Sequence, residues 1–216
     1  MTIDWLAVAK SWKRLEYVAK PAAMVALLLW LWTNGAATGG PALTWFTLGL
    51  LGSLAGDVLL LLSERFFLGG LVAFLLGHIA YIAGLNAGSL LLPVEAILFI
   101  PMALVGGWLF WGIGAALKAK GRSKLLVPVA LYAAVISLMV VSALTTLFRP
   151  GSLRGPAILV SLGAILFFVS DAVLAWNRFV TPVPRGKLVV IVTYHLGQMA
   201  LIAGAAQLFS LSGTIL

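Results

Sequence analysis

Residues 41–62 read PALTWFTLGLLGSLAGDVLLLL, an apolar run in which Asp57 is the only charged side chain. A helix of about 20 apolar residues is long enough to cross the hydrocarbon core of a bilayer. A carboxylate in such a helix is costly to bury, and ionisable residues inside membranes usually serve a function. The stretch therefore predicts a membrane-spanning helix and raises the question of why it contains an acid.

The whole chain has the composition of an integral membrane protein. Its 216 residues are 62% hydrophobic and only 9% charged, which lies outside the range of soluble globular domains. The apolar runs are about 20 residues long, whereas the strands of a membrane barrel need about 10 with alternating polarity. We therefore expect an all-α, polytopic transmembrane helical bundle in a cell membrane, which in a bacterium is the inner membrane.

Glycine, proline, asparagine and charged residues divide the apolar sequence into separate segments. Seven candidate spans result: Pro21–Thr38, Pro41–Leu62, Phe66–Asn86, Leu90–Leu117, Leu125–Phe148, Gly155–Trp176 and Leu188–Leu208. The fourth span carries Pro93 and Pro101, so we expect it to tilt or kink.

The distribution of basic residues between the loops predicts the orientation of the chain. When the loops are assigned alternately to two sides, all but two of the 14 Lys and Arg residues fall on one side. Only Arg149 and Arg154 fall on the other. By the positive-inside rule the N-terminus is cytoplasmic and the C-terminus is outside. The net charge of +8 thus reflects topology, and we expect no nucleic-acid partner.

The first residues differ from the rest of the chain. Residues 1–19 are too polar to span a membrane or to act as a cleavable signal peptide. Apolar side chains within them predict a short amphipathic interfacial segment: Trp5, Leu6, Val8, Ala9 and Trp12. Residues 20–216 are then a single transmembrane domain. The absence of cysteine from the sequence excludes disulfides, thiolate metal sites and a thiol nucleophile.

A weak internal repeat relates the two halves of the chain. Asp57-Val-Leu-Leu and Gly77-His78-Ile-Ala-Tyr-Ile-Ala-Gly84 have counterparts in Asp171-Ala-Val-Leu and Gly197-Gln198-Met-Ala-Leu-Ile-Ala-Gly204. This pattern predicts a three-plus-one-plus-three architecture of parallel repeats, as in some transporters. Repeat 1 covers about 20–87, a linker helix about 90–117 and repeat 2 about 124–209. The alternative is that small and apolar residues recur by chance.

The repeat places two acids at one depth. Asp57 lies seven residues before Glu64, and Asp171 lies seven before Arg178, so both carboxylates are about 10 Å from the cytoplasmic helix ends. A pseudo-twofold axis along the membrane normal would let both face one central cavity. Small residues at helical spacing allow a neighbouring helix to approach near Asp57: Gly49, Gly52, Ser53 and Gly56. The alternative is that each acid separately bonds a neighbouring helix.

Further polar side chains fall within the predicted spans and are candidates to line the same cavity: His78, Tyr81, Tyr194, His195 and Gln198. For His195 an ordinary interhelical hydrogen bond explains its presence equally well. Lys20 lies at the expected cytoplasmic face, where it can snorkel or meet a lipid phosphate. Two histidines cannot form a three-histidine zinc site, although two histidines with one or two aspartates are an alternative ligand set. No nucleotide-binding or serine-hydrolase motif occurs. We expect no metal and no cofactor.

Two carboxylates in an apolar cavity suit a reaction in which one group acts as the acid and the other as the base. Burial and mutual repulsion favour one protonated and one ionised group. Such a pair can protonate a substrate and direct water to an oxocarbenium-like intermediate. Cleavage of acetals and of vinyl ethers is of this kind.

The ordered motifs resemble those of the YhhN-like membrane proteins, which include the lysoplasmalogenases. The motifs are Lys20-Pro21, Gly56-Asp57, Gly77-His78-x-x-Tyr81, Ser170-Asp171 with Leu174, and Tyr194 with Gly197-Gln198. Each is short, but their order and spacing extend from about Lys20 to about Gly204. Members of that family are commonly drawn with eight spans, whereas the region before Lys20 is too polar here for an additional one.

The resemblance implies hydrolysis of the vinyl-ether bond of a lysoplasmalogen to a fatty aldehyde and glycerophosphoethanolamine or glycerophosphocholine. It implies that Asp57 and Asp171 are the catalytic pair. His78, Tyr81, Tyr194, His195 and Gln198 would orient water or substrate, and Lys20 would attract the head-group phosphate. The expected partners are a lysophospholipid and membrane lipids, with the oligomeric state open. The alternatives are a small-solute transporter with a polar site between the repeats, and a structural or sensory membrane protein.

Overall fold

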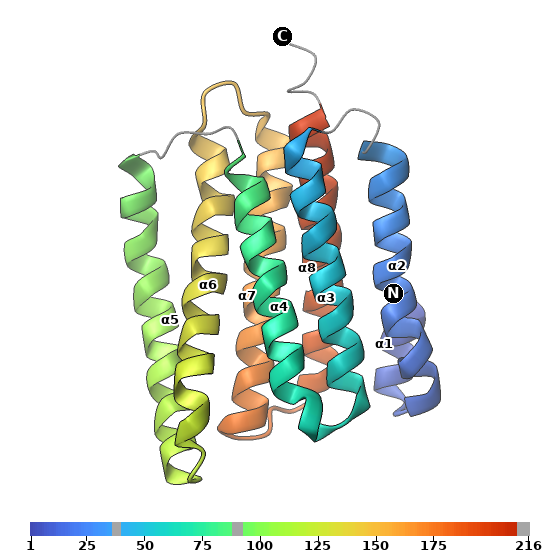
Figure 1. Ribbon diagram of the computed structural model, residues 1–216, viewed down its shortest axis with the longest axis vertical. Helices are drawn as coiled ribbons and strands as arrows, with labels where there is room; N and C mark the ends of the chain where they lie inside the picture. The colour runs from blue at the N-terminus through green and yellow to red at the C-terminus, as the bar shows by residue number, and fades with distance from the viewer. Residues whose placement is uncertain (36–39, 88–92, 211–216) are drawn as a thin grey trace.

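The computed structural model describes residues 1–35, 40–87 and 93–210 (Figure 1). In these ranges the backbone is helical and contains no strand. The helices are α1 (Thr2–Ala9), α2 (Lys13–Gly35), α3 (Pro41–Leu62), α4 (Phe67–Leu85), α5 (Pro93–Ala119), α6 (Leu126–Thr145), α7 (Arg154–Phe179) and α8 (Gly186–Ser210). Short 3₁₀ turns precede α4 and α6 and follow α6.

Seven of these helices, α2 to α8, are long and apolar enough to cross a membrane. The prediction of an all-α protein with seven spans is therefore confirmed, and the chain is a multipass membrane protein. The expected ends at Thr38 and Leu90 lie outside the described residues, as do residues 211–216.

The start predicted for the first span is wrong. We expected this helix to begin at Pro21, where the apolar run begins after the charged residues. Instead α2 begins at Lys13 and contains Pro21 in its interior. Proline removes one hydrogen bond from a helix interior, and here that loss does not end the helix. Lys20 consequently lies inside the span rather than at its edge.

The long helices stand side by side, with α2 and α5 at opposite edges of the bundle (Figure 1). The connections α3–α4, α5–α6 and α7–α8 lie at the lower end in this view. We call this the basic end, because the connections and adjoining turns carry Arg65, Lys120, Arg122 and Arg185. Helix α1 lies next to the lower half of α2 and contacts both α2 and α8.

Glycines allow two helix pairs to pack with their backbones almost in contact. In the α7–α8 pair, a Cβ added at Gly163 would lie 2.7 Å from Leu201 Cα. In the α3–α4 pair, a Cβ at Gly52 would lie 2.9 Å from Gly77 Cα. Small residues that permit close approach are a usual device of membrane helix packing. These two pairs form the rigid centre of the bundle, and α5 packs outside them against α6 and α7.

Replacing Gly163 with Ala should lower the melting temperature of the detergent-solubilised protein by several degrees. The added methyl meets the α8 backbone, which cannot move aside as a side chain can, and overpacking of this kind costs about 1–3 kcal/mol. Gly107→Ala is the matched control, because a Cβ there meets nothing within 4 Å. Equal melting temperatures for the two variants would contradict the close α7–α8 packing.

Candidate functional site

The carboxylate of Asp57 is completely buried and has two partners from other helices. Lys20 Nζ, on α2, lies 3.0 Å from Asp57 Oδ1. The Tyr194 hydroxyl, on α8, donates a hydrogen bond of 2.8 Å to Asp57 Oδ2. We call these three residues the Asp57 cluster. A cation and a phenol directed at one carboxylate favour its ionised form.

The position expected for Lys20 needs correction. We expected it at the cytoplasmic membrane face, where it would snorkel or meet a lipid phosphate. Because α2 begins seven residues earlier, at Lys13, Lys20 lies about 10 Å along the helix from its start. At that depth its side chain is only 14% exposed and pairs with Asp57.

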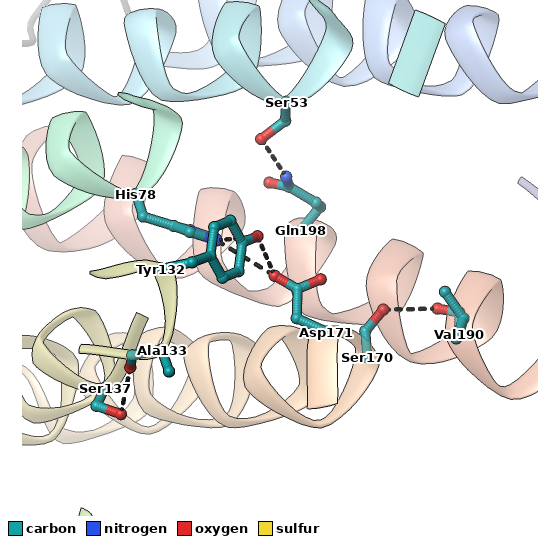
Figure 2. Close-up of polar contacts among 9 residues, drawn as sticks. All are labelled: Ser53, His78, Tyr132, Ala133, Ser137, Ser170, Asp171, Val190 and Gln198. Atoms are coloured by element: carbon teal, nitrogen blue, oxygen red, sulfur yellow. Dashed lines mark hydrogen bonds and ion pairs between the residues drawn. The ribbon is translucent and has the colours of Figure 1, made fainter. Parts of the chain in front are cut away.

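Asp171 has a different environment, formed by three helices that meet in Figure 2. The Tyr132 hydroxyl, on α6, donates a short hydrogen bond to Asp171 Oδ2. His78 Nε2, on α4, lies 3.3 Å from the same oxygen and 2.9 Å from the Tyr132 hydroxyl. We call these three residues the Asp171 cluster. Next to it, Ser170 Oγ donates to the Val190 carbonyl at 3.0 Å and ties α7 to α8.

Sequence reasoning missed Tyr132. The signal available was a phenol in the middle of an apolar span, between Leu131 and Ala133. It was overlooked because Tyr132 belongs to none of the repeated motifs, whereas Tyr81 and Tyr194 lie in or beside them.

An amide network and an aromatic ring lie between the two clusters. The Tyr81 hydroxyl donates to Gln198 Oε1 at 2.8 Å, and Gln198 Nε2 donates to Ser53 Oγ at 2.9 Å. Figure 2 shows the Gln198 amide directed at Ser53. The ring of Phe167 lies 4.7 Å from that of His78 and 5.2 Å from that of Tyr194. The predicted polar side chains therefore gather in and between the two clusters, and His195 alone among them has its hydrogen bond to α1.

His195 makes its polar contacts with α1, although its ring lies 5.6 Å from that of Tyr194 in the Asp57 cluster. Trp5 Nε1 donates a hydrogen bond of 3.0 Å to His195 Nδ1. Asp4 Oδ2 lies 3.8 Å from His195 Nε2, and both side chains are fully buried. His195 therefore makes an interhelical hydrogen bond, which is the alternative that the sequence left open for it. These contacts also show that α1 docks on α8 through a buried face, while Ile3 and Leu6 are exposed.

An apolar cavity lies between α4, α5, α6 and α7 and reaches the Asp171 cluster. Tyr132 and Asp171 are part of its lining, together with apolar side chains such as Phe74, Phe110 and Phe168. Asp57 is not among the lining residues. We expected both acids to face one cavity, and in the structure only Asp171 does so.

The arrangement is suited to proton transfer. Asp171 is 13% exposed, lies at an apolar cavity and shares a proton-bearing network with a phenol and an imidazole. Among the residues described, no three His, Asp or Glu side chains gather closely enough to hold a metal ion.

The comparisons with known proteins agree with the motifs. A sequence model of the YhhN family matches residues 15–205. The chain is 30% identical to lysoplasmalogenase TMEM86B of Mus musculus over 205 residues, covering 94% of this chain and 80% of the mouse protein. It is 34% identical to lysoplasmalogenase TMEM86B of Sus scrofa over 164 residues, covering 73% and 62%. It is 28% identical to lysoplasmalogenase TMEM86A of Homo sapiens over 169 residues, covering 77% and 67%. No solved structure matches the chain.

Replacing Lys20 with Met should destabilise the protein by about 3–5 kcal/mol, because it leaves the Asp57 carboxylate buried without a cation. The double variant Lys20→Met with Asp57→Asn should recover most of that loss, since no charge remains buried. Unfolding in detergent, followed for the wild type, both single variants and the double variant, measures the coupling. Additive effects of the two substitutions would contradict the ion pair.

The Asp4 carboxyl should make stability depend on pH. Burial raises its pKa from 3.8 to about 6, although Lys20 opposes the shift. The folded state therefore holds a proton that the unfolded state has lost, and this stabilisation disappears as the pH rises from about 4 to about 7. We expect the melting temperature to fall across that window, and to fall less in Asp4→Asn. Identical pH profiles for the two proteins would contradict the burial of an acid at this position.

Proposed function

The chain belongs to the YhhN family, and from this premise we propose that it is a membrane-embedded hydrolase that cleaves the vinyl-ether bond of lysoplasmalogens. The names of its relatives in mouse, pig and human support this assignment. The products would be a fatty aldehyde and glycerophosphoethanolamine or glycerophosphocholine.

The observation that carries the proposal is the position of Asp171. An acid bonded by Tyr132 and His78 stands at an apolar cavity inside a membrane protein. Apolar cavities with a few convergent polar groups are typical binding sites. A lipid chain fits the apolar lining, and a vinyl ether is a neutral group that an acid can activate by protonation.

We assign the proton transfer to Asp171. Its protonated carboxyl gives a proton to the vinyl β-carbon, and the electron pair of the double bond forms the new C–H bond. The α-carbon becomes an oxocarbenium ion, which water attacks while the Asp171 carboxylate takes up a proton from that water. The resulting hemiacetal loses the glycerol oxygen as an alcohol and leaves the aldehyde. The net reaction adds one water to the vinyl ether.

We assign Asp57 the role of a fixed anion. Lys20 and Tyr194 hold it as a carboxylate in the Asp57 cluster. A preorganised negative charge stabilises the positive charge that develops on the substrate, and such charges act strongly where water is excluded. The two aspartates thus divide the work, with one transferring protons and the other stabilising charge.

We also propose that the chain is a parallel three-plus-one-plus-three repeat with its basic end in the cytoplasm. The surroundings of the two acids support the repeat. Asp57, on α3, is contacted from α2 and α8, and Asp171, on α7, is contacted from α6 and α4. Each acid therefore meets the first helix of its own repeat and the last helix of the other. The excess of Lys and Arg at the basic end supports the orientation.

Detergent-purified protein incubated with a lysoplasmalogen should release aldehyde, and Asp171→Asn should reduce the rate at least 100-fold, the usual range for loss of a general acid. Asp57→Asn should also reduce it strongly. Glu95→Gln, which removes an acid from the first turn of α5, is the matched control and should keep wild-type activity. Size-exclusion profiles and melting temperatures check folding.

The absence of aldehyde from the wild-type reaction would contradict the hydrolase. Uptake of a solute into sealed vesicles, without aldehyde, would instead support the transporter alternative. Full activity in both aspartate variants would contradict the assignment of the site.

A further inference from the structure

A second hollow lies at the basic end and adjoins the apolar cavity. Its charged lining residues are Glu64, Arg65, Arg122 and Arg178. Arg178 and the rings of Phe67 and Phe179 line both spaces. The two spaces therefore meet at these three side chains, with three guanidinium groups and one carboxylate lining the hollow and the Asp171 cluster lining the cavity.

Arg178 is held in place at the junction of the two spaces. Its guanidinium carbon lies 3.8 Å from the centre of the Phe67 ring. Its Nε is buried and has no hydrogen-bond partner. Its ion-pair partner Glu64 has a side chain that is 84% exposed, whereas that of Arg178 is 26% exposed. Arg178 donates hydrogen bonds from both terminal nitrogens to Glu64, and because this carboxylate is exposed to water, a phosphate can take its place without leaving the arginine unpaired.

We propose that this hollow binds the phosphate of the lysophospholipid, with Arg178 as the main ligand and Arg65 and Arg122 as supporting charges. This inference rests on the proposed function and names the part of the site that selects the substrate. Arginine binds phosphate through two parallel hydrogen bonds, so the contact is both strong and specific in its geometry. The hollow has more positive than negative charge, and Glu64 remains available to the ammonium group of a zwitterionic head group.

The separation between Arg178 and Asp171 matches the substrate. The two residues are seven positions apart on α7, so they lie on nearly the same face about 10 Å apart along the helix. In a lysoplasmalogen the glycerol separates the phosphorus atom from the vinyl β-carbon by seven covalent bonds, about 8 Å when extended. With its phosphate at Arg178, the substrate places its double bond near Asp171 and its alkenyl chain in the apolar cavity.

Lys20 is a poor alternative for this role. Its ammonium is already paired with Asp57, and Lys20 lines neither the cavity nor the hollow. A phosphate bound at Lys20 would have to compete with a buried carboxylate, and release of that carboxylate is costly.

The test compares two substrates that differ in the phosphate. Steady-state aldehyde release is measured in neutral detergent for a 1-alkenyl-glycerophosphoethanolamine and for the corresponding 1-alkenylglycerol. Arg178→Gln should raise KM for the phospholipid at least tenfold, as expected for the loss of a bidentate charged contact, and leave KM for the neutral substrate unchanged. Arg178→Lys should recover part of the loss. Arg154→Gln is the matched control, because Arg154 is an exposed arginine at the opposite end of α7.

A binding measurement separates this inference from the hydrolase itself. Titration with a saturated 1-alkyl lysophospholipid, which has no vinyl ether to cleave, should show weaker binding to Arg178→Gln than to wild type. The phosphate-free 1-alkylglycerol should bind both equally. If the wild type binds this phospholipid through Arg178 but releases no aldehyde, the hydrolase fails and the phosphate site stands.

Three results would overturn the phosphate site. One is an equal change in KM for both substrates, and another is no change for either. The third is an equal effect of Arg154→Gln, which would indicate general attraction of lipid to a basic surface. If Arg178→Gln does not fold, the double variant Arg65→Gln with Arg122→Gln replaces it, because both side chains are exposed, and the same three results apply.

Discussion

The buried ion pair between Lys20 and Asp57 is the constraint on which the arrangement of the bundle depends. An unpaired charge at this depth in a bilayer is very unfavourable, so the acid requires a cation from within the protein. Lys20 supplies it at 3.0 Å from α2, and Tyr194 supplies a hydroxyl at 2.8 Å from α8. One carboxylate thereby brings α2, α3 and α8 together. Buried apolar side chains of α2, among them Met24 and Leu31, and a hydrogen bond from Tyr17 to the Leu61 carbonyl complete the contacts of this helix with the central helices.

The surroundings of Asp171 differ from those of Asp57. Among the described residues Asp171 has no Lys or Arg as an ion-pair partner, and it is bonded by a phenol and an imidazole, groups that can accept or donate protons. It also stands at a cavity, whereas Asp57 is enclosed. Two chemically identical groups therefore have different surroundings. This difference explains why a charge-stabilising role suits Asp57 and a proton-transferring role suits Asp171.

In the proposed site, the path from the basic end to Asp171 would set the geometry of the reaction. Its two parts have opposite character, with arginines at the surface and apolar rings inside. An amphiphile can enter such a path in one direction only, because its phosphate must stay near water and its chain must leave water. Helix α7 carries both the acid and the arginine, so the distance between them is set by helix rise and does not depend on a flexible loop.

The sequence by itself determined the class of the fold, the number of spans and the candidate acids. Apolar runs of bilayer length specify helices locally, and acids within such runs stand out without knowledge of the partner helices. Only the tertiary structure decided which side chains meet. The pairing of Lys20 with Asp57, the role of Tyr132 beside Asp171 and the contact of His195 with Trp5 depend on which helices are neighbours and how each is rotated about its axis. Those properties arise from packing between distant segments, such as the glycine contact of α7 with α8, and the linear pattern of each span does not encode them.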